Sequence, residues 1–224
     1  LLKEQAKEFL LDRYGVNGLV QSDIDLLDFY ISEKTHDFIN VIYNPSLCII
    51  LQGAKSVGFG DEMSGYDEQR YLLTSIYTPL RVSITDASKE RPYISLSLKF
   101  SMDEIYEVLK NVEIKDDNMQ KSQKGVFFGD LTEEILEPVL RFILLLEKPK
   151  EKIKFLSDLA KKEILYTLVT SDKSGYFLTK FAMQGSVSNK ILNAVAKIKN
   201  EFSQKLNMKE VARLRYEQIG RAHV

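Results

Sequence analysis

The sequence predicts an α+β protein, in which an antiparallel β-barrel of the jelly-roll type precedes a helical segment. From Gly18 to Phe100, apolar and polar residues alternate with a period of two, and Gly, Asp and Pro mark the turns. After Phe100 the apolar residues recur at helical spacing. Roughly eighty residues of strand and turn are enough for a small double-sheet barrel, which limits exposed sheet edges.

The strand region is preceded by a helix. Leu1 to Tyr14 has an amphipathic pattern, and Gly15 is a usual helix stop. The most distinctive strand is the apolar run from Leu47 to Leu51, bounded by Pro45 and by Gln52-Gly53. Proline suits the start of a strand, and a short apolar run between such signals predicts a strand buried on both faces.

Alternation indicates further strands around this central one. Gly60-Asp61 is a hairpin signal of the kind that begins with glycine. The strands that we expect from the alternating pattern include residues 27–32, 57–59, 63–66, 71–76, 80–85 and 94–99.

The helical segment begins with a capping signal. Ser101 and Glu104 have the spacing of a capping box. Residues 111–124 are polar and predict a loop. Further helices are expected over 132–146, 153–169 and 174–183, and Pro138 should kink the first of these or displace its start.

The run from Phe142 to Leu146 is apolar at five successive positions. Such a run has an apolar residue on every side of a helix, so it should touch two partners. One partner can be the barrel and the other a second subunit. We therefore predict a homodimer through the helices between Thr132 and Val169, although these helices could equally serve only as core support.

The C-terminal part has a different character. Gln184-Gly185-Ser186 is the expected linker, a helix should start near Ser188, and Asn207 with Glu210 forms a reciprocal cap. Between residues 184 and 213 there are six basic and two acidic residues. Residues 219–224 match one reading frame of a common sequencing adapter, so we expect 214–224 to be a non-native tail. The predicted organisation is 1–100, 101–184, 185–213 and the tail 214–224.

Composition limits the classes of function. The 224 residues include 31 Lys and Arg against 32 Asp and Glu, which gives a net charge of −1, so any nucleic-acid role must be local. The single Cys48 excludes an internal disulfide and suits a reducing compartment, which predicts a cytoplasmic protein. No apolar run has the length of a membrane span, and no secretory signal opens the chain.

The sequence offers little for catalysis. The two histidines are His36 and His223, and the second lies in the suspected tail. A catalytic metal site needs several His and carboxylate ligands at close spacing, so we predict no metal and no cofactor. Cys48 lies in an apolar strand without a local His, which argues against nucleophilic catalysis.

Several motifs resemble the N-terminal sensor domain of AraC/XylS-type transcriptional regulators. The resemblance runs from about residue 43 to residue 213. Its most specific parts are Pro45-Ser46-Leu47-Cys48 with Gln52-Gly53-Ala54-Lys55, Tyr71-Leu72-Leu73 with Pro79, Glu163-Ile164-Leu165-Tyr166, and Asn207-Met208-Lys209-Glu210-Val211-Ala212.

The resemblance implies a cupin-like barrel that senses a small-molecule effector, a helical dimerisation segment, and the start of a helix-turn-helix domain. It implies a non-enzymatic regulator whose full-length parent binds DNA. In this family the helix opened by Asn207 belongs to the first of two helix-turn-helix motifs, and the pattern stops at Arg213. We therefore expect this chain to bind DNA only non-specifically, through Lys190, Lys197, Lys209 and Arg213.

For the effector we predict a mostly apolar pocket in the barrel with a few polar groups. The strand region supplies the tyrosines Tyr30, Tyr43, Tyr66, Tyr71, Tyr77 and Tyr93. From these and the strand ends we select Tyr30, Gln52, Tyr71 and Tyr77 as pocket residues. Two other interpretations stay open: a barrel enzyme of the cupin kind, which metal ligands would distinguish, and an interaction domain without a ligand.

Overall fold

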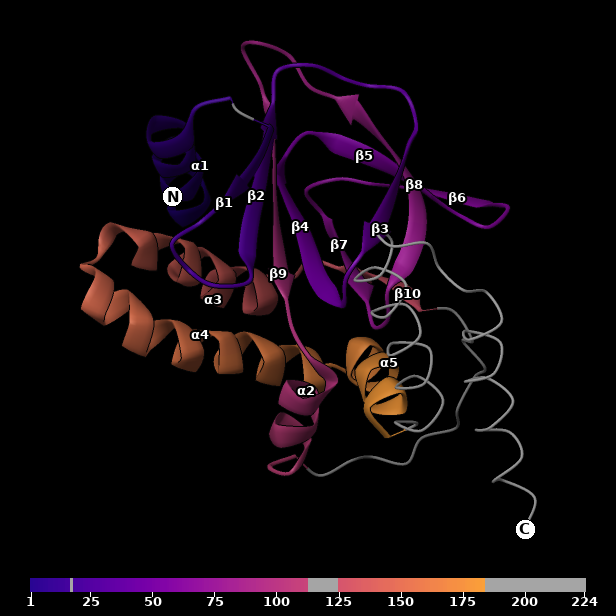
Figure 1. The fold of residues 1–224 in the computed structure, drawn as a ribbon, viewed down its shortest axis with the longest axis vertical. Helices are drawn as coiled ribbons and strands as arrows, with labels where there is room; N and C mark the ends of the chain where they lie inside the picture. Colours follow the sequence, from indigo (N-terminus) through magenta and orange to yellow (C-terminus); the bar gives the residue numbers. More distant parts are fainter. Residues whose placement is uncertain (17, 113–124, 184–224) are drawn as a thin grey trace, which may run out of the picture. The chain divides into compact units, whose positions relative to one another are not determined.

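The computed structural model describes residues 1–16, 18–112 and 125–183, and these residues form an α+β fold with antiparallel sheets (Figure 1). The strands form a six-stranded and a four-stranded sheet. The helices lie against one face of the larger sheet, and the smaller sheet lies against its other face. The α+β class and the antiparallel strands are as the sequence predicted.

The six-stranded sheet contains the central strand that the apolar run predicted. Strand β4 is buried from Ser46 to Leu51 and pairs with β9 on one side and β7 on the other. In sheet order, the strands are β1 (Gly18–Gln21), β2 (Leu27–Ser32), β9 (Tyr93–Lys99), β4 (Ser46–Gln52), β7 (Arg70–Thr74) and β10 (Val126–Asp130).

The four-stranded sheet includes the predicted hairpin. Strands β5 and β6 are joined by a turn in which Gly60 has φ 58°, a conformation that glycine adopts readily. In sheet order, the strands are β3 (Ile39–Tyr43), β8 (Thr78–Asp86), β5 (Ala54–Phe59) and β6 (Glu62–Tyr66).

The expected closed barrel is not formed by the described residues, because none of their strand pairs joins the two sheets. The chain passes between the two sheets at several connections, and the one from β4 to β5 is at Gly53, which has φ 92°. The register shifts between Ile50 and Gln52 on one side of this glycine and between Ala54 and Lys55 on the other. These irregularities turn the chain away from β9 and toward β8, so the strands make a two-layered sandwich.

Helices α2 and α3 begin after the residues that the sequence predicted, Ser101 and Thr132, whereas α4 and α5 begin two or three residues earlier than predicted. The Ser101 hydroxyl accepts from the Glu104 amide, and the Glu104 carboxylate accepts from the Ser101 amide, which completes the capping box. Pro138 does not displace the start of its helix, which is Glu133. The helices are α1 (Leu2–Tyr14), α2 (Met102–Leu109), α3 (Glu133–Leu144), α4 (Lys150–Thr170) and α5 (Asp172–Met183), with a 3-10 turn η1 (Leu145–Glu147) after α3.

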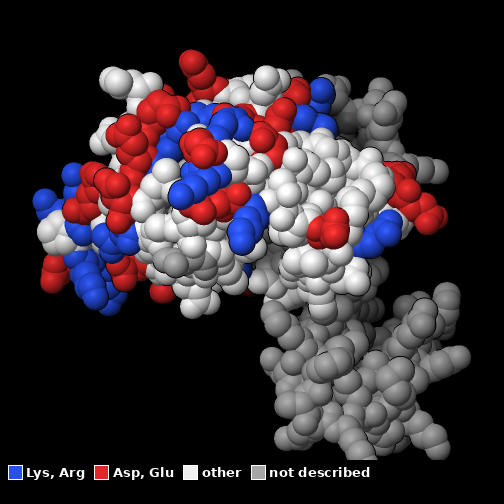
Figure 2. All heavy atoms as spheres, turned by 90° about the horizontal axis from the view of Figure 1, so that it is seen from above, with Lys and Arg blue, Asp and Glu red and all other residues white. Residues whose placement is uncertain are grey.

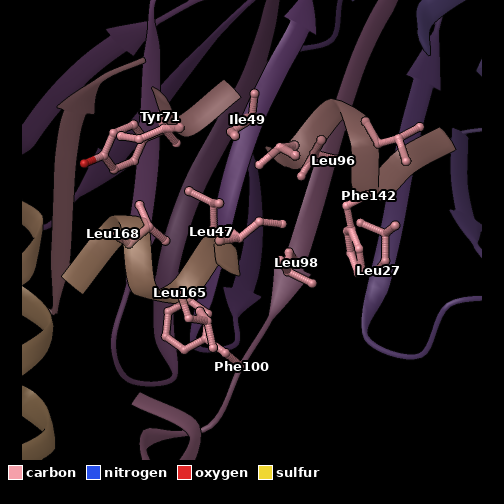
Figure 3. Close-up of a cluster of buried hydrophobic side chains, with 14 of the residues drawn as sticks. Leu27, Leu47, Ile49, Tyr71, Leu96, Leu98, Phe100, Phe142, Leu165 and Leu168 are labelled. Atoms are coloured by element: carbon pink, nitrogen blue, oxygen red, sulfur yellow. The ribbon is translucent and has the colours of Figure 1, made fainter. Parts of the chain in front are cut away.

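Two hydrophobic clusters lie on opposite faces of the six-stranded sheet. Figure 3 shows the cluster on the helix side, where Leu47 and Leu98 of the sheet meet Phe142 of α3 and Leu165 of α4. The other cluster fills the space between the two sheets and includes Ile50, Val57, Leu72, Leu80 and Val82. The larger sheet is therefore the shared wall of both clusters.

Strand β10 was not predicted from the sequence. It adds to the edge of the six-stranded sheet next to β7, with Gly129 opposite Tyr71. A Cβ at position 129 would overlap the Tyr71 ring, so the glycine makes room for this aromatic side chain. A five-residue strand that contains a glycine gives a weak alternating signal, which explains the omission.

Candidate functional site

Alternation along the strands of the larger sheet, apart from the edge strand β1, divides their side chains between the two clusters. On β4, Leu47 and Ile49 belong to the helix side, whereas Cys48 and Ile50 face the smaller sheet. On β9, Ile94 and Leu96 belong to the helix side, and Tyr93 faces the smaller sheet. The space between the sheets is thus lined by a distinct set of residues, and this set contains most of the polar chemistry.

Tyrosines from four strands meet between the sheets. Tyr66 of β6 and Tyr93 of β9 are buried members of the inter-sheet cluster, and Tyr30 of β2 and Tyr43 of β3 pack against it. The rings of Tyr30 and Tyr93 make an edge contact with centroids 6.3 Å apart. Together with Cys48 and Lys55 they form what we call the inter-sheet polar cluster: Tyr30, Tyr43, Cys48, Lys55, Tyr66 and Tyr93.

Lys55 brings a cation into this cluster. Its Nζ atom donates to the Tyr43 hydroxyl at 2.7 Å, and it lies 5.4 Å from the centroid of the same ring. Two residues further along β5, Val57 is buried between the sheets, so the strand pattern directs Lys55 to the same side. Burial lowers the pKa of Lys55, and the neighbouring Cys48 thiol acts in the opposite direction.

The Tyr93 hydroxyl is a buried polar group without a hydrogen bond. The residue is fully buried, and its Oη atom has no hydrogen-bond partner among the described residues. Burial raises the pKa of Tyr93, and the nearby Ser95 hydroxyl offsets part of that rise. The geometry between the Tyr93 and Ser95 hydroxyls is not that of a hydrogen bond. Unpaired buried groups are rare and costly, so each calls for an explanation such as a bound water or ligand.

Cys48 lies among these groups as a thiol. Its Sγ atom is 3.6 Å from the Ser46 hydroxyl and 3.8 Å from that of Ser97. Burial raises its pKa, an effect that outweighs these two hydroxyls and the nearby Lys55. A raised pKa keeps the sulfur protonated at neutral pH, so it offers neither a nucleophile nor an anion.

The structure brings one of the four predicted pocket residues into the polar cluster. Tyr30 lies between the sheets, as described above. Gln52 lies near α1, where its side chain accepts from Lys7 at 3.1 Å and donates to the carbonyl of Pro92 at 2.8 Å. Tyr71 is on the helix side of β7 and packs against Phe127.

The fourth predicted residue, Tyr77, is half-buried in the connection between β7 and β8. The sequence analysis named Tyr43, Tyr66 and Tyr93 as strand tyrosines without selecting them, and it did not select Lys55 at all. Lys55 could have been identified from its position two residues before Val57, which faces the smaller sheet.

The sequence analysis also made predictions about metal ligands, DNA contacts and membrane spans. Among the described residues no group of three His, Cys, Asp or Glu side chains could hold a metal ion. His36 is in the connection between β2 and β3, where its Nδ1 atom contacts the Asp37 carbonyl oxygen at 2.7 Å. The DNA-contact residues predicted from the basic segment, Lys190, Lys197, Lys209 and Arg213, lie outside the described residues. No helix in the described part of the chain is long and apolar enough to cross a membrane.

Comparison with solved structures gives distant similarities. Apo ToxT K231A of Vibrio cholerae is 8% identical, with a TM-score of 0.47 over 89% of this chain and 72% of that chain. ToxT of the same organism bound to an unsaturated fatty acid is 12% identical, with a TM-score of 0.40 over 86% and 85%. The AraC-like transcriptional activator CuxR is 11% identical, with a TM-score of 0.32 over 90% and 75%. At these scores the similarities carry no argument about this chain.

Comparison by sequence gives a clearer result. No curated protein matches the chain. Residues 23–176 match the family model described as the N-terminus of AraC-type transcriptional regulators, and this match includes every strand from β2 to β10. Because the match spans more than half of the chain, the chain belongs to the AraC-type transcriptional regulator family, of which it contains the N-terminal regulatory domain.

Proposed function

We propose that this chain is the effector-sensing and dimerisation part of an AraC-type transcriptional regulator, and that its small-molecule effector binds between the two sheets. The observation that carries this proposal is the inter-sheet polar cluster, with the unpaired Tyr93 hydroxyl inside an apolar layer. Ligand sites combine apolar walls with a few placed polar groups, and this layer has both.

The effector must bind one arrangement of the protein better than another, since otherwise it could not switch anything. Strand β10 joins the effector site to the helices through adjacent residues. Phe128 contacts Tyr66 between the sheets, with ring centroids 5.5 Å apart. Phe127 stacks on Phe177 of α5 with centroids 5.4 Å apart. A ligand that moves Tyr66 therefore has a short route to α5.

A thermal-shift screen of a ligand library tests the effector site, because a ligand that binds only the folded state raises its melting temperature. For each hit we expect Tyr66→Phe and Tyr93→Phe to weaken binding severalfold. Tyr106→Phe is the matched control, since Tyr106 lies on α2 and is 51% exposed. Hits that bind both inter-sheet variants as tightly as the wild type would show that the effector binds elsewhere.

The proposed homodimer uses α4 rather than the run that first suggested it. Phe142, Ile143 and Leu146 are buried within the chain, and Leu145 is packed against the same core, so these side chains already have partners. The exposed apolar side chains are instead on α4: Phe155, Leu159 and Tyr166 are 71%, 53% and 50% exposed. Their spacing places them on one helix face, which a second copy can cover by two-fold symmetry.

Sedimentation equilibrium of the full chain tests this dimer. We expect Phe155→Glu to give a folded monomer whose melting temperature does not depend on protein concentration, because the side chain is exposed in the single chain. The control is Tyr106→Glu, which changes an exposed aromatic residue on another helix. A wild-type chain that stays monomeric at high concentration would contradict the assignment.

DNA binding is proposed for the full-length parent. On the face of the described residues that Figure 2 shows, Lys and Arg side chains lie among Asp and Glu side chains. The net charge of the chain is −1. Phosphate attraction is therefore assigned to the segment with Lys190, Lys197, Lys209 and Arg213. We expect DNA binding by the present chain to be weak, equal for promoter and scrambled DNA, and lost as salt rises. A titration that shows a preference of about tenfold for the promoter would contradict this expectation.

We propose that the regulator acts in the cytoplasm, which suits a single buried thiol.

A further inference from the structure

We propose that the ligand held between the sheets is an organic anion with an apolar body, and that the Lys55 ammonium binds its acid group. This inference rests on the proposed effector site and specifies the chemistry of the ligand. It comes from the cation that the chain places between its sheets and that no carboxylate of the described residues pairs with.

The other lysines with limited exposure show what is unusual about Lys55. Lys161 has a side chain that is 9% exposed and pairs with Glu104 at 2.7 Å, and Lys99 pairs with Asp28 at 2.5 Å. Lys55 contacts a phenol, and no carboxylate of the described residues pairs with it. A partly buried charge without a counterion costs free energy, and a bound anion would remove that cost.

The groups around Lys55 can donate hydrogen bonds to an anion. Tyr43 accepts from the ammonium, so its own O–H is available as a donor. The Tyr93 hydroxyl has no hydrogen-bond partner in the part of the chain that the structure describes. The Cys48 thiol adds no negative charge, because its pKa is raised. On the same face of β2 as Tyr30, the Asp28 carboxylate is already paired with Lys99.

The walls of the same layer determine the rest of the ligand. The inter-sheet cluster contains fully or almost fully buried aliphatic side chains from both sheets: Ile50, Val57, Leu72, Leu80, Val82 and Ile84. A ligand with many hydroxyls would leave polar groups unpaired against these residues. A carboxylate on an aliphatic or aromatic body fits both parts of the layer, and a bare inorganic anion fits only one.

A purely structural role for Lys55 makes the opposite prediction about stability. If the contact with Tyr43 stabilises the sandwich, Lys55→Met should lower the melting temperature. If the charge is kept for a ligand, a methionine of similar length should leave the free protein equally stable or make it more stable. Loss of ligand binding combined with unchanged or increased stability is the signature of a binding residue.

The experiment is calorimetric titration of the full chain with octanoate and 4-phenylbutanoate, and with the alcohols octan-1-ol and 4-phenylbutan-1-ol as neutral counterparts. We expect wild-type protein to prefer an acid over its alcohol by about tenfold or more, the effect of one charged hydrogen bond. Lys55→Met should abolish that preference, and Lys55→Arg should keep most of it. Lys34→Met, at an exposed position, is the control.

Each outcome has a defined meaning. Equal binding of acids and alcohols to the wild type, or a preference that survives Lys55→Met, overturns the anion inference while leaving an effector site between the sheets. Inorganic phosphate that binds as tightly as the organic acids overturns the apolar body. If Lys55→Met does not fold, Tyr93→Phe decides instead: it should weaken acid binding severalfold, and unchanged acid binding overturns the inference. Failure of the library screen described above, in contrast, removes the effector site itself.

Discussion

The ion pair between Lys161 and Glu104 gives the sharpest stability prediction, because its two partners differ in exposure. The Lys161 side chain is 9% exposed and that of Glu104 is 40% exposed. Glu104 also closes the capping box of α2, where its carboxylate accepts from the Ser101 amide at 2.8 Å. The pair therefore connects the cap of α2 to the middle of α4.

The two single substitutions should differ in cost. Glu104→Gln keeps a residue suited to the capping box but leaves the Lys161 ammonium buried without a counterion. With a discount for the exposure of Glu104, we expect a loss of about 1–3 kcal/mol in the free energy of unfolding. Lys161→Met keeps the apolar stem, and Glu104 retains its bonds to Ser101, so about 1 kcal/mol or less should be lost. The double variant should resemble Lys161→Met alone.

Guanidinium unfolding of the four proteins at one protein concentration measures these differences. The pH dependence adds a second readout. Burial acts to raise the pKa of Glu104, but hydrogen bonds from Lys161 and Ser101 and the Lys161 charge outweigh it, so the pKa lies below its usual value of 4.5. A depressed carboxyl pKa contributes stability above pH 4.5, and this contribution disappears as the pH falls through the folded-state pKa.

The gap between wild type and Glu104→Gln should therefore be full at pH 7 and narrow below pH 4.5. A Lys161→Met variant that loses as much stability as Glu104→Gln would refute the reasoning, because it would show that burial of the lysine does not govern the cost. So would a gap that does not change with pH.

Three further predictions concern the fold and its ligands. Gly129→Ala should cost about 1–3 kcal/mol in chemical unfolding, because the new Cβ would overlap the buried Tyr71 ring. Gly53→Ala should cost a similar amount, about 1–3 kcal/mol, since this glycine has φ 92° and faces the Asp86 carbonyl; Gly65→Ala, with open space around it, should cost about 1 kcal/mol or less. Metal analysis of the purified protein should find no stoichiometric transition metal, and chelation should leave the melting temperature unchanged.

Local patterns in the sequence were sufficient to predict most elements of the fold. The capping box of α2, the hairpin at Gly60 and the buried strand β4 each depend on a few adjacent residues, so a short stretch identifies them. Closure of the sheet depends on long-range pairing. At Gly53 the chain passes from β4 in one sheet to β5 in the other, with irregularities in register on both sides that no local pattern reveals.

The site was harder to predict for the same reason. Choosing among six tyrosines requires knowing which face of a strand each one occupies. Tyr71 and Leu72 differ by one position, yet Tyr71 packs against the helices and Leu72 lies between the sheets. In β4, which is apolar on both faces, the sequence has no polar alternation to tell the faces apart.

The two faces of the larger sheet offer the proposed inter-sheet ligand a physical connection to the helices, which it would not touch. Strands β2, β9, β4, β7 and β10 of this sheet place alternate residues in the two hydrophobic clusters, so one layer of sheet lies between the proposed ligand site and the helices. On β10, the Phe128 ring contacts Tyr66, and the ring of its neighbour Phe127 stacks on Phe177. Phe177 in turn packs against Phe181 near the end of α5. Close-packed interiors resist gradual deformation, so a displaced aromatic ring on one face requires a rearrangement on the other. Under the proposed function this rearrangement would reach α5, which is the described element nearest in sequence to the segment that carries Lys190 and Arg213.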